Sequence, residues 1–254
     1  MWTPVVRSFD VRLYEGVGWR LVEAQHKVST LKLTDDLEEQ ELLESLIEQT
    51  KPDMPAECRT LDYLLATPFR YGAIYPHGSR FRRAGKTPGV FYAAEQPETA
   101  MAELAFYRLL FFAESPQTPW PVNPFEFTAF SVALRTERSL DLTAAPLSDE
   151  RATWTHPTDY SACQALADDA RADHIALLRY ESVRDPRHGK NLAVLDRAVF
   201  AEPRPLERRT WRLKLGPAGA HAICEFPVAK IGFDRAAFAA DPRIAGFVWE
   251  RPGG

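Results

Sequence analysis

The sequence predicts a mixed α+β domain with a mostly antiparallel β core and flanking helices. Runs of strand character outnumber helical runs, and the two kinds follow one another irregularly along the chain. This order is typical of α+β folds, whereas a parallel sheet requires a regular alternation of strands and helices. The chain has 254 residues, of which 45% are hydrophobic, and it contains no linker-like stretch. We therefore expect one core domain at residues 61–254, with an N-terminal extension at residues 1–60 packed on it.

The N-terminal extension is expected to hold two short strands and one amphipathic helix. The strands are predicted at residues 11–14 and 30–33. Thr34 or Asp35 can cap the helix, and Lys51-Pro52 ends it. The apolar side chains of this helix form one stripe, which consists of Leu37, Leu42, Leu43, Leu46 and Ile47.

A strand and the helix after it are the clearest elements of the chain. Residues 89–94 are a compact apolar run bounded by turn residues, which predicts a strand. Pro97 then opens a helix that is predicted to reach residue 112. A shorter helix is predicted upstream, at residues 59–66. The apolar positions of the longer helix are expected to form core: Met101, Leu104, Ala105, Leu109 and Phe112.

The second half of the chain is mostly predicted to be strand. Two strands are expected at residues 125–134 and 139–143, and a third at 175–180. A helix is predicted at 160–172, and most of 192–233 has strand character. Residues 234–254 carry no strong signal of either kind.

Charge, hydropathy and cysteine spacing argue against several classes of protein. The net charge of −4 argues against a surface built to bind nucleic acid or anionic membranes. No stretch approaches the roughly 18 apolar residues of a membrane span, and the first residues do not resemble a secretory signal. Cys58, Cys163 and Cys224 are widely spaced, which favours reduced thiols in a cytoplasm over a disulfide framework or a zinc site.

Glu103, in the predicted helix at 97–112, is the residue that most needs a functional explanation. Its neighbours three and four positions away include no basic side chain; they are Thr99, Ala100, Phe106 and Tyr107. A buried charge is costly unless a partner comes from elsewhere. Arg80, Arg82 and Arg83 are candidate partners, and Tyr92 offers an aromatic face and a hydroxyl. From the residues alone, the simpler alternative is that Glu103 is a rim residue and that the three arginines form a solvated loop.

Three stretches of the chain resemble the core of the RES domain, a family of toxins from bacterial RES–Xre toxin–antitoxin pairs. They are Gly78-Ser79-Arg80-Phe81-Arg82-Arg83, then Val90-Phe91-Tyr92 with Glu98-Thr99-Ala100-Met101-Ala102-Glu103, then Arg179-Tyr180-Glu181-Ser182-Val183-Arg184 followed by Gly189-Lys190-Asn191-Leu192. Gln164 also resembles a recurring family position. Residues 20–25 look like the larger branch of the family that includes the ParT toxins. Arg80 and Arg82 are alternatives for the family's arginine, and Ser79-Arg80-Phe81 resembles its surroundings better.

The resemblance implies an ADP-ribosyltransferase-like fold and an enzyme that takes NAD⁺ as its substrate without a metal. Cleavage of the nicotinamide–ribose bond passes through an oxocarbenium-like centre, which a nearby carboxylate stabilises. The implied catalytic residues are therefore Glu103, with Arg80 and Ser182. The residues implied to bind NAD⁺ are Arg70, Tyr71, Arg80, Arg82, Tyr92, Ser182 and Asn191. Among these, an arginine fork suits the diphosphate, and Tyr92 suits stacking on the nicotinamide ring.

Several functions remain open at this point. The leading hypothesis is a bacterial toxin that transfers ADP-ribose from NAD⁺ to a protein, and the ParT branch implies phosphoribosyl pyrophosphate synthetase as that protein. The second is a hydrolase or phosphorylase that depletes NAD⁺. The third is a non-enzymatic nucleic-acid-binding module, which the basic cluster at 80–86 with its interleaved Phe81 suggests. The resemblance also implies an Xre-type antitoxin that covers the NAD⁺ cleft and alone contacts nucleic acid, with no role for a membrane.

Overall fold

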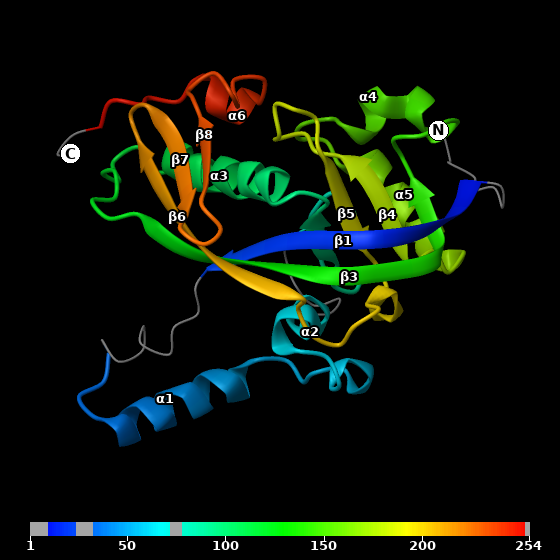
Figure 1. The fold of residues 1–254 in the computed structure, drawn as a ribbon, viewed down its shortest axis with the longest axis horizontal. Helices are drawn as coiled ribbons and strands as arrows, with labels where there is room; N and C mark the ends of the chain where they lie inside the picture. The colour runs from blue at the N-terminus through cyan, green and yellow to red at the C-terminus, as the bar shows by residue number, and fades with distance from the viewer. Residues whose placement is uncertain (1–9, 24–32, 72–77, 252–254) are drawn as a thin grey trace.

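The computed structural model describes residues 10–23, 33–71 and 78–251, and its centre is one eight-stranded sheet with helices packed around it (Figure 1). The strands are β1 (Val11–Glu23), β2 (Phe91–Ala94), β3 (Phe125–Asp141), β4 (Leu177–Glu181), β5 (Lys190–Val194), β6 (Glu207–Gly216), β7 (Gly219–Cys224) and β8 (Ala229–Phe233). The helices are α1 (Leu37–Thr50), α2 (Tyr63–Arg70), α3 (Pro97–Glu114), α4 (Arg151–Trp154), α5 (Ser161–Ala172) and α6 (Pro242–Ala245). The predicted architecture, a β core with flanking helices, is confirmed.

Five of the strands close into a ring. β1 pairs with β2, the order continues through β5, β4 and β3, and β3 pairs again with β1. Among the pairings of the described strands, β3 with β4 is parallel and the others are antiparallel. β6, β7 and β8 continue from the first half of β3 as an antiparallel meander. The long β3 therefore joins the ring to the meander.

The two strands predicted at 125–134 and 139–143 are one strand, and that prediction was wrong. Residues 135–138 are polar and mostly exposed, which interrupts the apolar pattern of β3. Their backbone nevertheless stays extended, because Arg135 and Thr136 pair with Glu15 and Tyr14 of β1. β1 likewise continues the predicted strand at 11–14 as far as Glu23. Pairing between strands far apart in the sequence decided both lengths, and side-chain periodicity does not report it.

α1 matches the predicted helix but begins with a different cap. The Asp36 carboxylate accepts the backbone N–H of Glu39, at 2.8 Å, in place of Thr34 or Asp35. α1 lies apart from the sheet, beyond α2 (Figure 1). Most of its apolar stripe is therefore exposed, including Leu37, Leu42, Leu46 and Ile47. Residues 30–32 of the second predicted N-terminal strand lie outside the described residues.

α2 corresponds to the helix predicted at 59–66 but is shifted by four residues toward the C-terminus. The Asp62 carboxylate caps it by accepting the backbone N–H of Leu64, at 2.9 Å. The predicted helix ended before Pro68, whereas Pro68 lies inside the last turn of α2.

α3 packs its apolar face on the sheet, as predicted. Met101, Ala105 and Leu109 are fully buried, and Phe112 is nearly so. This face belongs to the same cluster as Trp19 of β1 and the inner side chains of β6 and β7. α3 is thereby fixed across β1, and its polar positions are held at the edge of the ring of strands.

Two further features bear on the chemistry open to the protein. Cys58, Cys163 and Cys224 are free and buried. Within residues 10–23, 33–71 and 78–251, no helix is both long and apolar enough to cross a lipid bilayer.

Candidate active site

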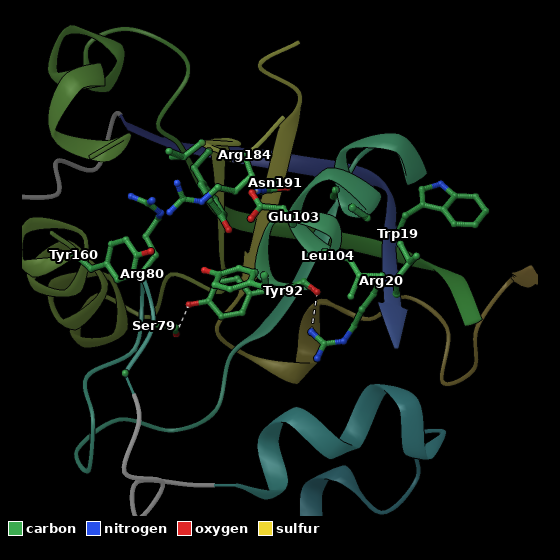
Figure 2. Close-up of a pocket in the computed structure, with 18 residues that line it drawn as sticks. Trp19, Arg20, Ser79, Arg80, Tyr92, Glu103, Leu104, Tyr160, Arg184 and Asn191 are labelled. Atoms are coloured by element: carbon green, nitrogen blue, oxygen red, sulfur yellow. Dashed lines mark hydrogen bonds between the residues drawn. The ribbon is translucent and has the colours of Figure 1, made fainter. Parts of the chain in front are cut away.

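A cavity of about 440 Å³ opens where α3 meets β1, β2 and β5. Two loops complete its wall, the turn at residues 79–82 and the loop that follows β4. Its volume is in the range of small-molecule sites. Figure 2 shows Glu103, Tyr92 and Asn191 near the centre of this pocket, with Arg80 and Tyr160 on one side and Arg20 on the other.

Glu103 is a half-buried carboxylate held by neutral donors. Its Oε1 accepts hydrogen bonds from Ser182 Oγ and from Asn191 Nδ2, each at 2.7 Å. None of the candidate arginines pairs with it: among the described residues no cation forms an ion pair with Glu103, and Arg83, for example, pairs with Asp168. Its second oxygen, Oε2, has no hydrogen bond from a described residue and lies on a side chain that lines the cavity. This arrangement orients a negative charge while one oxygen stays available to a ligand.

Ser182 lies behind Glu103 and is fully buried. Its hydroxyl donates to Glu103 and accepts the backbone N–H groups of Arg184, at 3.2 Å, and Asp185, at 3.0 Å. A serine hydroxyl has one donor and two acceptor lone pairs, so these three bonds use its full capacity. Ser182 therefore shapes the loop after β4 and orients Glu103, with no hydrogen-bonding group left for a ligand in this conformation.

The same loop is fastened to α3 one turn before Glu103. Thr99 Oγ1 donates to the buried Asp185 carboxylate at 2.7 Å. Thr99 and Glu103 are four positions apart, so a helix presents both on one face. Gly189 allows this close approach, because a Cβ there would lie 2.1 Å from Thr99 Oγ1 and 2.6 Å from Asp185 Oδ2. Two contacts along one face of α3 thus fix the loop that carries Ser182.

Arg80 lines the cavity although little of it is exposed. Its guanidinium donates to the carbonyl oxygens of Trp154, at 2.8 Å, and His156, at 3.0 Å. It also lies over the Tyr160 ring, 4.5 Å from the ring centroid. These bonds fix the charge in place beside the cavity.

Tyr92 and the turn at 79–82 support each other. The Tyr92 hydroxyl lies 2.8 Å from Ser79 Oγ and accepts the backbone N–H of Phe81 at 3.0 Å. Burial raises the pKa of Tyr92, which keeps it a neutral phenol. Gln164 Nε2 donates to the carbonyl oxygens of Ser79 and Arg82, and so holds the turn from the other side. The ring of Tyr92 faces the cavity on a firmly positioned strand.

Four of the predicted NAD⁺-binding residues do not line the cavity: Arg70, Tyr71, Arg82 and the fully buried Ser182. Arg82 donates to the Tyr71 carbonyl oxygen at 2.6 Å and so ties the turn to the end of α2. Arg70 pairs with Glu48 of α1, at 2.5 Å, and donates to the Pro52 carbonyl oxygen. Of the two alternative arginines, the structure places Arg80 at the cavity and Arg82 behind it.

Comparison with known families gives a match over most of the chain. A family model described as the RES domain matches residues 54–216. The chain belongs to the RES domain family. A solved structure similar to it is the MbcT–MbcA toxin–antitoxin complex of M. tuberculosis, with 14% sequence identity, a TM-score of 0.45, and coverage of 77% of this chain and 83% of that chain. A search of curated proteins gave no match.

Arg20 of β1 lines the cavity from outside the matched RES segment. Its guanidinium donates to the Tyr92 carbonyl oxygen at 2.8 Å and lies 5.0 Å from the Phe91 ring centroid. Its Nε is buried without a partner, and burial lowers the pKa of Arg20 to about 10. We did not predict this residue as part of the site. The available signal was a single cation in an otherwise apolar stretch of β1, beside Trp19 and Leu21.

Three tyrosines in the cavity wall also escaped prediction. They are Tyr107 of α3, Tyr160 at the start of α5, and Tyr180 of β4. Tyr107 is four positions after Glu103, so the helix period was enough to place it on the same face. Tyr160 and Tyr180 reach the cavity through tertiary packing, which the local sequence does not report. The described part of the RES fold contains no group of three or more side chains suited to hold a metal ion.

Proposed function

We propose that this RES domain protein is the toxin of a toxin–antitoxin pair and that it cleaves NAD⁺ and transfers ADP-ribose to a protein. The observation that carries the proposal is Glu103, a carboxylate that pairs with no cation of the described residues and lines a cavity together with Arg80 and Arg20. One negative group among fixed cations suits a substrate with a cationic nicotinamide and an anionic diphosphate.

The proposed reaction breaks the bond between the ribose C1′ and the nicotinamide nitrogen. The bonding electron pair leaves with nicotinamide, and the acceptor's nucleophile forms the new bond to C1′ and loses a proton. Positive charge builds up on the ribose in the transition state, so a nearby carboxylate lowers the barrier. Glu103 supplies this charge, and its Oε2 is the atom available to a ribose hydroxyl.

Arg80 and Arg20 take the anionic part of the substrate in this proposal. A guanidinium fork matches the oxygens of a diphosphate, whereas a lysine loses the paired geometry. Arg80 is fixed by the loop at 154–156, and Arg20 is fixed by the Tyr92 carbonyl oxygen. An anion beside Arg20 compensates a charge that burial otherwise disfavours. Tyr92 stacks on the nicotinamide ring.

Labelled NAD⁺ tests the reaction directly. The purified protein is incubated with NAD⁺ labelled in its adenylate part, first with bacterial lysate and then alone. We expect a discrete labelled protein band, and the ParT-like segment makes phosphoribosyl pyrophosphate synthetase the first purified acceptor to add. Free ADP-ribose, or its phosphate derivative, without a labelled band would instead establish the depletion of NAD⁺. No consumption of NAD⁺ under either condition would refute the enzyme.

The proposed antitoxin is of the Xre type and acts by covering the cavity. We expect it to abolish NAD⁺ turnover in the cytoplasm, where a free toxin would consume the host's own NAD⁺. Turnover measured with and without the co-expressed antitoxin tests this, and equal rates in the stable complex would contradict it. The nucleic-acid-binding alternative receives little support, because Arg80 and Arg82 are buried and Arg83 pairs with Asp168.

A further inference from the structure

The C-terminal segment after β6 lies beyond the matched RES segment, yet one of its side chains reaches the loop of the site. Asp241, which caps α6, is almost fully buried. Its Oδ2 accepts a hydrogen bond from Arg184 Nη1 at 2.5 Å, and both side chains of this ion pair are buried. Arg184 lies two residues after Ser182 and lines the cavity.

Contacts hold both the backbone and the guanidinium of Arg184. Its backbone N–H donates to Ser182 Oγ, and its guanidinium lies 3.9 Å from the centroid of the Phe106 ring. Its Nη2 donates to the Pro157 carbonyl oxygen at 2.6 Å. Asp241 is the carboxylate that faces it. A buried guanidinium without that carboxylate would carry an uncompensated charge.

Arg184 and Arg80 hold the same loop. Arg80 donates to the carbonyl oxygens of Trp154 and His156, and Arg184 donates to that of Pro157. Figure 2 shows both arginines on the same side of the pocket. The contacts at neighbouring carbonyl groups thus bring two guanidinium groups to one stretch of the cavity wall.

We propose that Asp241 is a positioning residue that holds Arg184 beside Arg80, so that these two arginines bind the anionic diphosphate of the dinucleotide from one side of the cavity while Arg20 faces it from the other (Figure 2). This inference rests on the proposed function. It adds that the segment after residue 216 is part of the site and sets the affinity for substrate. The chemical step depends on Glu103, which Ser182 and Asn191 hold independently of Asp241.

Steady-state kinetics on four variants test the proposal. The variants are Asp241→Asn, Arg184→Met, the double variant that carries both changes, and Asp234→Asn. Asn retains the ability to cap α6, and Met retains an apolar stem over Phe106. Asp234 is the matched control, because its carboxylate accepts the backbone N–H groups of Ala236 and Ala237 in the same segment without contacting Arg184.

We expect Asp241→Asn and Arg184→Met each to raise KM for NAD⁺ about tenfold, as fits the loss of one charge-assisted contact, with kcat changed less than about threefold. The double variant should have a KM no higher than that of Arg184→Met, because Arg243, the other arginine that pairs with Asp241, does not line the cavity. Asp234→Asn should keep the wild-type KM. If Asp241→Asn does not fold, the double variant reports the same KM, because it removes the buried Arg184 charge together with its carboxylate and leaves only the half-buried Arg243 without this partner.

The outcomes separate this inference from the proposed function. If the wild-type protein turns over NAD⁺ and the double variant has an unchanged KM, the role of Asp241 and Arg184 is overturned and the proposed function stands. Equal losses in kcat and in kcat/KM would also overturn it, since they would place the effect on the chemical step. Absence of NAD⁺ turnover by the wild-type protein would overturn the proposed function, and the inference with it.

Discussion

Two carboxylates contact the loop after β4, and they are held in opposite ways. Glu103 accepts hydrogen bonds from a serine and an amide, both neutral, and lines the cavity. Asp241 pairs with Arg184 and Arg243. Burial alone raises the pKa of Asp241, but hydrogen bonds from Arg243 and the attraction of Arg184 outweigh it and lower the pKa. Two arginines compensate the charge of Asp241, whereas no cation in the described part of the chain pairs with Glu103.

The difference teaches which carboxylate can act on a ligand. The Asp241 carboxylate is bonded to two arginines and does not line the cavity, so it presents no oxygen to a ligand. Glu103 keeps its charge uncompensated beside a cavity, where a cationic centre is the missing partner. Neutral donors fix its orientation without reducing its charge. The comparison therefore predicts that changes at Glu103 act on catalysis and that changes farther from it act on binding or stability.

The largest effect is expected from Glu103→Gln. Glutamine keeps the size and accepts the same two hydrogen bonds but carries no charge, so we expect kcat for NAD⁺ to fall about 1,000-fold, as for the loss of one main electrostatic contact in an active site. Thermal unfolding should occur within a few degrees of the wild type. Turnover of labelled NAD⁺ is the measurement, and an active variant would remove Glu103 from the mechanism.

The next effect separates the two arginines of the turn at 79–82. Arg80→Lys keeps the charge but loses the planar fork, so we expect kcat/KM to fall about 100-fold. Arg82→Lys is the matched control, because Arg82 donates to the Tyr71 carbonyl oxygen outside the cavity. Arg82→Lys should lower the unfolding temperature and leave kcat/KM close to the wild-type value. The reverse result would make Arg82 the arginine of the site.

Ser182→Ala tests whether orientation of Glu103 matters as much as its charge. The variant removes the donor to Glu103 Oε1 and the acceptor for two backbone N–H groups. We expect kcat to fall about tenfold to a hundredfold, the usual range when a supporting hydrogen bond to a functional group is lost. Combined with Glu103→Gln, it should add little, because the two act as one unit. Additive losses would indicate a direct contact between Ser182 and the substrate.

Some of this site was predictable from the sequence, for local reasons. A compact apolar run indicated the strand at 91–94, and helical periodicity indicated α3; these two elements carry Tyr92 and Glu103 of the cavity wall. The lack of a basic neighbour within one turn correctly marked Glu103 as a residue whose partners come from elsewhere. The apolar face of α3, with Met101 and Leu109, followed from the same period.

The rest depended on contacts between distant segments. Nothing near Arg20 in the sequence shows that β1 pairs with β2, where Trp19 lies opposite Ala94. This pairing brings Arg20 to the cavity wall. The length of β3 and the pairing of Arg184 with Asp241, 57 positions apart, are of the same kind. Side-chain periodicity reports what an element buries, whereas these features depend on which element it meets.

Arg20→Met tests whether a cation of the cavity contributes to NAD⁺ binding or to the stability of the fold. Burial disfavours the Arg20 charge, and no carboxylate among the residues that the structure describes pairs with it, so we expect its removal to change the free energy of unfolding by less than about 1 kcal/mol. NAD⁺ binding, measured by calorimetry with the inactive Glu103→Gln background, should weaken about tenfold. A strongly destabilised variant with unchanged affinity would instead make Arg20 a structural residue.

The smallest effect is expected from Arg70→Ala. Arg70 was a candidate for NAD⁺ binding, but its guanidinium pairs with Glu48 and donates to the Pro52 carbonyl oxygen, and so connects α2 to the exposed α1. Exposed ion pairs of this kind contribute little to stability because solvent screens them. We therefore expect kcat and KM for NAD⁺ to stay within about twofold of the wild type. A large rise in KM would mean that the end of α2 moves toward the cavity when substrate binds. Arg70 would then join Arg80, Arg184 and Arg20 as a cation that contacts the substrate.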